Sequence, residues 1–221
     1  MTSCLLISGA GDYADPWHPF DVTAERLAAV LEPVAGEVDV RTDVDAALAE
    51  QTGEARLLVV NIGNAGPGTP SDAARAGLLR HLEAGRPLLV LHVSATAFPD
   101  WPEWEAVMGG RWVEGTTFHP EKTVVAVRAD PGHPIATGLP DFVAQDEAYT
   151  ALRVGVQVTV LAHHDLDGAA HPLAWAHRFG TAPVVYLALG HDAGAYDAPG
   201  TRELVRRSAQ WLLDSAPSAG S

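Results

Sequence analysis

Cysteine is almost absent from this sequence: Cys4 is the single one, so no internal disulfide can form. We therefore expect a reducing compartment, the cytoplasm, as the location of the protein. Long apolar runs are also missing, and no stretch approaches the roughly 20 residues of a membrane-spanning helix. The N-terminus has no basic leader, so the apolar stretch that includes Cys4 predicts a first strand rather than a signal peptide.

Basic residues are scarce as well. Lysine and arginine together number 14 against 28 aspartates and glutamates, which gives a formal net charge of −14. This balance argues against nucleic acid, whose phosphates need a basic surface, and against anionic membranes or highly anionic substrates. The acidic residues are scattered, as on an ordinary solvated surface. A small neutral substrate is compatible with this charge.

The length of 221 residues, with 47% apolar and 19% charged residues, fits one globular domain that can bury a sizeable core. We expect a single domain over residues 1–213. The remaining residues, 214–221, are of low complexity at the end of the chain and are expected to be disordered.

The first half alternates strands and helices. Unbroken apolar runs at 4–9, 55–63 and 87–93 predict buried strands, and 37–43 predicts an alternating strand. Helical spacing is found in three segments, namely 22–33 ended by Pro33, 43–51, and 69–85 with Thr69 as N-cap, Pro70 in the first turn and Gly85 at the end.

This alternation predicts an α/β fold with a parallel sheet covered by helices on both faces. Such sheets place ligand sites at the carboxyl ends of their strands. The residues that follow the predicted strands are therefore the first candidates for a site: Gly9, Asn61, Gly63, His92 and Ser94.

The second half has a different pattern, with strand-like segments joined by short turns. These segments, 123–129, 151–165, 171–179 and 183–192, predict antiparallel strands appended to the parallel sheet. An amphipathic helix over 198–214 closes the chain, with Leu204, Ala209, Trp211 and Leu212 as expected anchors.

Histidines recur at predicted loops and strand ends. His18, His119, His133 and His171 precede proline, which favours extended backbone, and His191 follows a buried strand. Together with His92 and the Asp146-Glu147 pair, His18, His119 and His191 could bind a divalent metal or transfer protons, although no compact metal motif is present. The other histidines are predicted to be structural or solvated: His81 on a polar helix face, His133 in a turn, and His163, His164 and His177 on strands.

Five ordered segments, "DPWHPF", "LVLHVSATAFPDWPEWEAVMGGRWVEGTTFHP", "GHPIATGLPDFVAQDEAYT", "HPLAWAHRFGTAPVVYLALGHD" and "RSAQWLL", resemble the ThuA-like family, which is named for trehalose utilisation. The resemblance extends to about Trp211. It implies a flavodoxin-like core similar to that of class I glutamine amidotransferases. Cys4 begins the first strand and cannot serve as their cysteine nucleophile, so glutamine hydrolysis through a thioester is excluded if this fold is correct.

The resemblance implies an enzyme of carbohydrate utilisation that acts on a sugar or a 3-keto sugar in a pocket above the sheet. The expected site residues fall into two groups: catalytic His92, His119, Glu147 and His191, and substrate-binding Trp17, His18, Ser94, Trp101, Tyr149 and Asp192, with Trp112 nearby. Two chemistries stay open. A divalent metal such as zinc could be bound by His92, His119 and His191, or a histidine–glutamate pair could transfer protons without metal.

Other readings carry less support. A triad of Ser94 with His119 or His191 and Glu147 lacks the flanking glycines of a nucleophile elbow. Glycoside hydrolysis needs two carboxyl groups on either side of the scissile bond, and only Asp146 or Asp192 could supply the second one beside Glu147. A nucleotide-binding flavodoxin-like domain is a further alternative, but the segment GAGDYAD after the first strand lacks the third glycine of a dinucleotide-binding fingerprint. A non-catalytic sugar-binding or regulatory module on the same fold, and a homo-oligomer, both remain compatible with the sequence.

Overall fold

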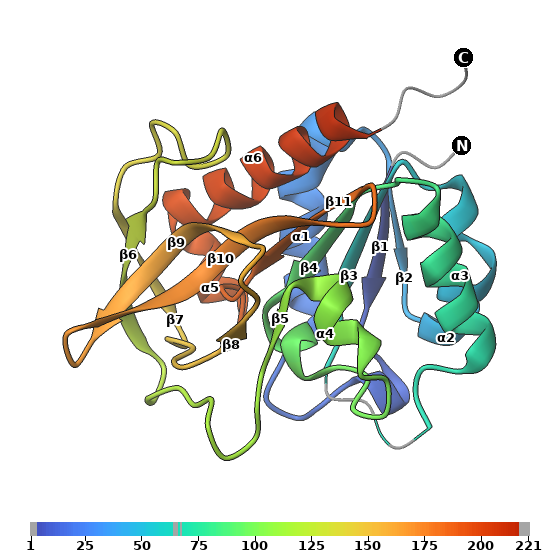
Figure 1. Ribbon diagram of the computed structural model, residues 1–221, viewed down its shortest axis with the longest axis horizontal. Helices are drawn as coiled ribbons and strands as arrows, with labels where there is room; N and C mark the ends of the chain where they lie inside the picture. The colour runs from blue at the N-terminus through green and yellow to red at the C-terminus, as the bar shows by residue number, and fades with distance from the viewer. Residues whose placement is uncertain (1–3, 64–65, 67, 217–221) are drawn as a thin grey trace.

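The structure is a computed structural model that describes residues 4–63, 66 and 68–216. Its main sheet is mixed and has the strand order β2-β1-β3-β4-β11-β10-β9-β6-β7 (Figure 1). Neighbouring strands are parallel from β2 to β11 and antiparallel from β11 to β7. The α/β prediction, with antiparallel strands appended in the second half, is confirmed.

The parallel half consists of β1 (Cys4–Ser8), β2 (Val38–Arg41), β3 (Leu57–Asn61), β4 (Leu88–Leu91) and β11 (Ala182–Leu187). Every residue of β1, β3, β4 and β11 is buried, which explains why these segments are apolar without alternation. Their order corresponds to the flavodoxin-like order 2-1-3-4-5, in which ligands bind beyond the carboxyl ends of the strands.

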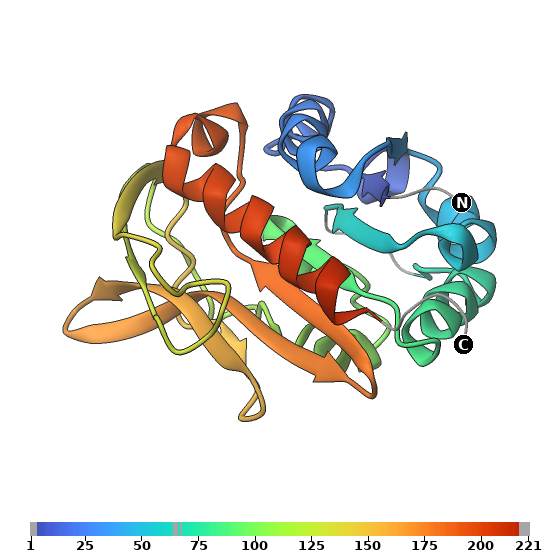
Figure 2. The same cartoon turned by 90° about the horizontal axis from the view of Figure 1, so that it is seen from above.

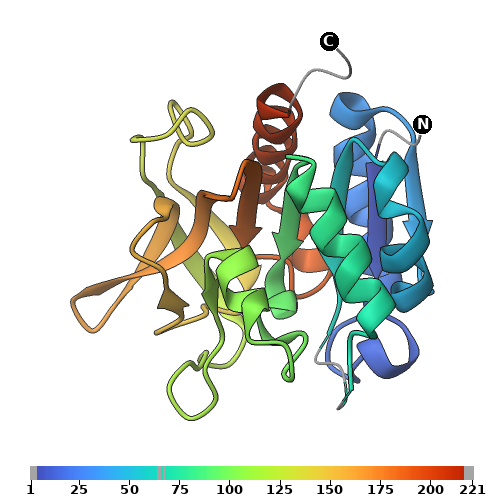
Figure 3. The same ribbon diagram turned by 45° about the vertical axis from the view of Figure 1, so that its right-hand side comes forward.

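Helices cover both faces of the parallel half. Helices α1 (Phe20–Ala35) and α6 (Pro199–Ser215) pack against each other on one face (Figure 2). On the other face lie α2 (Val44–Glu50), α3 (Asp72–Glu83) and the short α4 (Glu103–Met108), which stand in front of the sheet in Figure 3. The core between these layers is therefore built from both faces of the same buried strands.

The antiparallel half folds the chain back towards the carboxyl ends of the parallel strands. It consists of β6 (Thr123–Ala129), β7 (Phe142–Asp146), β9 (Thr159–Leu166) and β10 (Ala169–Phe179), while β5 (Gly110–Arg111) and β8 (Arg153–Val154) form a separate small ladder. The short helix α5 (Ala193–Asp197), which follows β11, packs on β7. This contact joins the end of β7 to the end of β11.

Two predicted helix boundaries are wrong. Pro33 lies inside α1, which continues to Ala35 because its buried face extends from Leu31 to that residue, and Gly36 with φ 76° then caps the helix. Helix α3 begins later than expected, since Ser71 rather than Thr69 is its N-cap and accepts from the backbone N–H of Ala74. Helix α6 ends at Ser215, one residue beyond the end of the expected helix at 214, and residues 217–221 of the expected tail lie outside the described residues.

His81 is buried rather than on the surface. Its exposed fraction is 1%, and its ring nitrogens lie 2.9 Å from the carbonyl oxygen of Thr52 and 3.0 Å from that of Pro87. The imidazole thus satisfies backbone groups between α3 and β4, a role that helix periodicity does not reveal. His164 is also buried, with Nε2 3.1 Å from the carbonyl oxygen of Tyr149. Within the described ranges no helix is both long and apolar enough to cross a membrane.

Candidate functional site

Four chain segments meet at the carboxyl ends of the parallel strands, at the lower edge of the sheet in Figure 1. They bring together His18 after β1, His92 at the end of β4, Glu147 after β7 and His191 after β11. One ligand atom from each residue lies within 4.8 Å of those of the other three. Residues up to 173 positions apart in the chain therefore form one cluster, here called the His/Glu cluster.

The backbone and ring of His92 are held from several sides. Its φ of 42° is left-handed, which turns the chain sharply out of β4 into a short 3₁₀ helix. Its Nδ1 lies 2.6 Å from the carbonyl oxygen of Ala188, and the phenol of Tyr186 donates to the carbonyl of His92. Because a carbonyl only accepts, Nδ1 carries a proton, and in this tautomer the lone pair of the ring is at Nε2.

That lone pair faces the centre of the cluster. His92 Nε2 lies 3.1 Å from the Tyr149 hydroxyl and 3.4 Å from Glu147 Oε2. The Tyr149 ring also stacks on the imidazole, with centroids 4.5 Å apart. Burial raises the pKa of Tyr149 well above its usual value, so its phenol stays protonated and can donate to His92.

Asp15 fixes His18. Its Oδ1 accepts from the ring Nδ1 of His18 at 2.7 Å and from the backbone N–H groups of Trp17 and His18 at 3.0 and 3.1 Å. The opposite nitrogen, His18 Nε2, is buried and has no hydrogen-bond partner in the described residues. Burial, with repulsion from His92 and against the attraction of Asp15, lowers the pKa of His18 to about 4, so the ring is neutral at pH 7.

Asp146 positions the other two members of the cluster. Its fully buried carboxylate accepts from the backbone N–H groups of Gly190 and Glu147, both at 2.8 Å, and from that of His191 at 3.3 Å. Burial raises the pKa of Asp146, and His92 and these N–H donors offset part of the rise. The carboxylate thus ties the exit of β7 to the exit of β11.

Glu147 is the central anion of the cluster. Its Oε1 lies 3.3 Å from Nδ1 of His191, and its Oε2 lies 3.7 Å from Nε2 of His119. Burial alone would raise the pKa of Glu147, but the adjacent imidazoles of His191 and His92 outweigh burial and lower it. Burial opposes charge on His191 too, yet Glu147, Asp192 and Asp146 together raise the pKa of that imidazole.

A pocket of about 500 Å³ opens above the cluster. Its lining combines polar and aromatic side chains: Asp15, Trp17, His18, Val93, Thr96, Trp112, His119, Glu147, Tyr149 and His191. Trp112 meets the Tyr149 ring edge-on at 4.8 Å, and His119 lies roughly parallel to that ring at 5.8 Å. A polar floor beneath aromatic walls is typical of a small-molecule site.

The structure places most of the predicted site residues at this pocket. Trp17, 73% exposed, stands at its mouth, and His119 borders it at 35% side-chain exposure. His119 lies outside the group of four that could share a metal, whereas His18, predicted to bind substrate, is inside that group. The metal ligands predicted from the sequence were His92, His119 and His191, whereas the structure groups His92 and His191 with His18 and Glu147.

Four predicted residues lie outside the pocket lining, and one of them, His92, is buried beneath it at 1% exposure. Ser94 is fully buried, and its hydroxyl bonds the backbone of Val60 and Ile62, so it is not presented as a nucleophile. Trp101 is buried against Phe98 and Trp104. Asp192 forms an ion pair with Lys122 and caps α5 through the N–H of Gly194.

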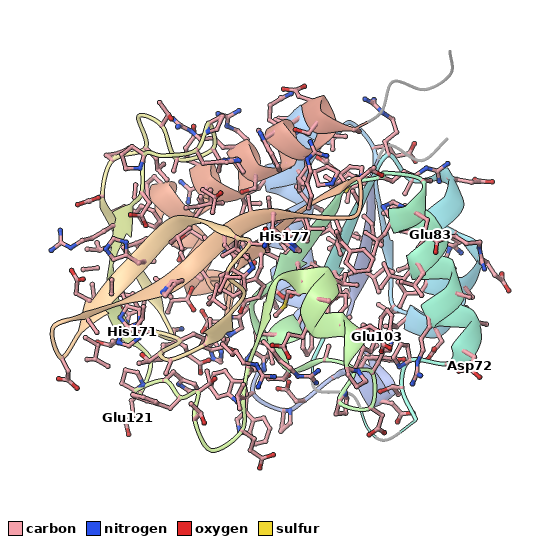
Figure 4. All side chains as sticks on the ribbon, viewed as in Figure 1. Asp72, Glu83, Glu103, Glu121, His171 and His177 are labelled. Atoms are coloured by element: carbon pink, nitrogen blue, oxygen red, sulfur yellow. The ribbon has the colours of Figure 1, made fainter. Side chains whose placement is uncertain are left out.

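The remaining histidines are engaged elsewhere. His171 and His177, labelled in Figure 4, belong to β10, where His177 Nε2 lies 2.9 Å from the carbonyl oxygen of Val107. Asp15 is the main site residue that the sequence analysis missed. Its signal was the DPWHPF segment, where a carboxylate precedes a histidine by three residues in a loop after a buried strand.

Comparison with known proteins shows the family of this chain. The family model ThuA, described as trehalose utilisation, matches residues 14–212, a range that contains all four members of the His/Glu cluster. The chain belongs to the ThuA family. No protein of curated function matches the sequence significantly.

Solved structures of the ThuA type have the same fold. A ThuA-like protein from Parabacteroides merdae aligns with TM-score 0.81 and 21% identity over 99% of this chain and 92% of its own. One from Bacteroides uniformis aligns with TM-score 0.73 and 21% identity over 95% of this chain and 90% of its own. A β-galactosidase from Rahnella sp. R3 aligns with TM-score 0.67 and 13% identity over 98% of this chain but 32% of its own.

Proposed function

We propose that this member of the ThuA family is an enzyme of carbohydrate utilisation that acts on a sugar or a 3-keto sugar derivative in the pocket above the His/Glu cluster. One observation carries the proposal: three imidazoles and a carboxylate from four distant segments converge on the floor of an aromatic-walled pocket. Buried, charge-coupled groups in a cleft are characteristic of catalytic sites.

The walls suit a neutral carbohydrate. Trp112 and Tyr149 can stack on the apolar face of a sugar ring, and Trp17 at the mouth adds a further exposed aromatic surface. Asp15, His18 and His119 offer hydrogen bonds to hydroxyl groups. A volume of about 500 Å³ accommodates a small molecule and falls in the usual range of ligand pockets.

The floor suits proton transfer at a carbon next to a carbonyl group. His92 is buried beneath the pocket lining with its Nδ1–H committed to Ala188, so its Nε2 can take up a substrate proton through the Tyr149 hydroxyl, which lies 3.1 Å away on a residue that lines the pocket. Glu147 is held anionic and stabilises the imidazolium that results. His119 is half-exposed, borders the pocket, and is available to protonate a substrate oxygen. Such general acid–base catalysis contributes roughly 10²–10⁴-fold in rate.

Amidotransferase chemistry does not fit these residues. Cys4, the single cysteine, is buried in β1, and burial raises the pKa of its thiol to about 12. Ser94 is locked by backbone hydrogen bonds below the pocket. The position at the exit of β4, where a nucleophile would stand, belongs to His92.

The test is turnover of 3-keto glucosides and 3-keto trehalose, followed by chromatography, with trehalose as the unoxidised comparison. We expect His92→Gln and Glu147→Gln to lower kcat at least 100-fold, since each removes a partner in proton transfer. His133→Gln is the matched control, because His133 packs against Trp211 away from the pocket. Sugar binding without turnover would contradict an enzymatic role and favour a sugar-binding module.

A further inference from the structure

We infer that His18, His92, Glu147 and His191 bind one divalent transition-metal ion, with zinc as the first candidate. This inference deepens the proposed function, since it concerns the same pocket, but it requires no particular substrate. Three imidazoles and one carboxylate form a nitrogen-rich donor set. Such a set favours zinc and neighbouring first-row ions over calcium or magnesium, which prefer oxygen ligands.

Unpartnered buried nitrogens point to a ligand that is missing from the hydrogen-bond network. His18 Nε2 and His191 Nδ1 are both buried and make no well-formed hydrogen bond in the part of the chain that the structure describes, although Glu147 Oε1 lies 3.3 Å from His191 Nδ1. Buried polar atoms are nearly always paired, so two orphans in one cluster need a reason. A metal ion between them would accept both lone pairs.

The supporting contacts orient each ring as a metal site requires. His18 donates Nδ1–H to Asp15, and His92 donates Nδ1–H to the carbonyl oxygen of Ala188. In both residues the lone pair is therefore at Nε2; that of His18 has no partner in the described residues, and that of His92 would exchange the Tyr149 hydroxyl for the metal. Metal-bound histidines characteristically donate their other N–H to a carboxylate or a backbone carbonyl, which fixes the tautomer and makes the ligand more basic.

The spacing of the donor atoms is near that of a bound ion. Tetrahedral zinc with bonds of about 2.0–2.1 Å separates its ligand atoms by roughly 3.4 Å. Glu147 already meets this spacing with His191 at 3.3 Å and with His92 at 3.4 Å. The widest separation in the cluster is 4.8 Å, so binding requires the side chains to contract inwards.

The negatively charged carboxylates around the cluster also favour a bound cation. The carboxylates of Asp15, Asp146 and Glu147 surround the imidazoles, and the lining residues given above include no lysine or arginine. Buried anions are costly unless they are paired or coordinate a metal. An ion at this place would face the pocket, where it could polarise a substrate carbonyl.

Zinc binding tests the inference without any substrate. After removal of metals with a chelator, the protein is titrated with zinc in competition with a chromophoric chelator, and bound metal is measured by elemental analysis. We expect one equivalent in the wild type. His18→Asn and Glu147→Gln should weaken binding by more than the roughly 10–100-fold that loss of a supporting partner costs.

Two matched controls make the ligand set specific. His119→Asn changes a histidine of the same pocket that lies outside the group of four, and His163→Asn changes one on β9. Both should retain one equivalent with affinity within about threefold of the wild type. A cobalt(II) complex provides a second readout, because its visible spectrum should lose intensity in His18→Asn and remain in His119→Asn. Far-ultraviolet circular dichroism verifies that each variant is folded.

Three results would overturn the inference: no stoichiometric binding at micromolar zinc, loss of binding in His119→Asn with retention in His18→Asn, or loss in His163→Asn. The outcome is separable from that of the proposed function. Turnover by protein that binds no zinc would support the proposed enzymatic activity and contradict the metal site. Zinc binding through the four residues without turnover of any keto sugar would support the metal site and contradict the proposed enzymatic activity.

Discussion

Gly190 allows a sharp test of how the exit of β11 is built. Its φ is 128°, a conformation that residues with a side chain rarely adopt, and its N–H bonds Asp146. A Cβ at this position would lie 2.6 Å from the hydroxyl oxygen of Tyr196. Gly190→Ala therefore introduces both backbone strain and a steric clash directly before His191.

The two costs can be separated. The backbone conformation costs on the order of 1–3 kcal/mol, and forcing extra volume into a packed site typically costs about 1–3 kcal/mol more. After the Tyr196 hydroxyl, the nearest atoms to the new Cβ are Tyr196 Cζ at 3.4 Å and His92 Cβ at 3.8 Å, which are ordinary contacts. Tyr196→Phe should therefore remove the clash and leave the strain.

A double-mutant cycle measured by urea unfolding tests this reasoning. We expect Gly190→Ala to lower the free energy of unfolding by roughly 3–4 kcal/mol. Tyr196→Phe alone should be nearly neutral, because the hydroxyl is buried without a partner in the described residues. The double mutant should recover about 1–3 kcal/mol as coupling energy. Equal effects of Gly190→Ala in both backgrounds would refute the clash, and a loss below about 1 kcal/mol would refute the strain as well.

Three further results are expected. Asp15→Asn should weaken zinc binding about 10–100-fold, because it removes the carboxylate that accepts a hydrogen bond from His18. Asp12→Asn, at an exposed position, should leave zinc affinity unchanged. Equal zinc affinities of the two variants would contradict the role of Asp15. Cys4 should resist iodoacetamide in the folded protein, since a thiol pKa of about 12 leaves only about one thiol in 10⁵ ionised at pH 7, and rapid native labelling would disprove its burial. Trp112→Leu should raise KM for a keto sugar about tenfold or more with little change in kcat, and a loss confined to kcat would place Trp112 outside substrate stacking.

The parallel half of the fold was predictable because burial on both faces leaves a direct trace in the sequence. Strands β1, β3 and β4 are unbroken apolar runs, and the rule for strand ends selected His92 before any contact was known. The same rule could not separate His92 from Ser94. One side chain turns into the cluster and the other into backbone hydrogen bonds, and only the geometry of the 3₁₀ turn decides which.

Long-range contacts were beyond the reach of local pattern. The sequence favoured His119 over His18 as a ligand, although His18 faces His92 and His191 at centroid distances of 5.1 and 4.8 Å. Nothing in the neighbouring residues of His18 records contacts with segments more than 70 positions away. His81 shows the same limit for a residue expected on the surface, since its ring contacts the carbonyl group of Thr52, 29 positions away, as well as that of nearby Pro87.

The central claim is that His18, His92, Glu147 and His191 form one metal-binding floor beneath the pocket. Diffraction from crystals of the wild-type protein grown with zinc, recorded on both sides of the zinc absorption edge, tests it most directly. The account predicts one strong anomalous peak bonded to the four side chains at about 2.0–2.2 Å. An empty cluster, or a peak held by other histidines while these four stay apart, would contradict it.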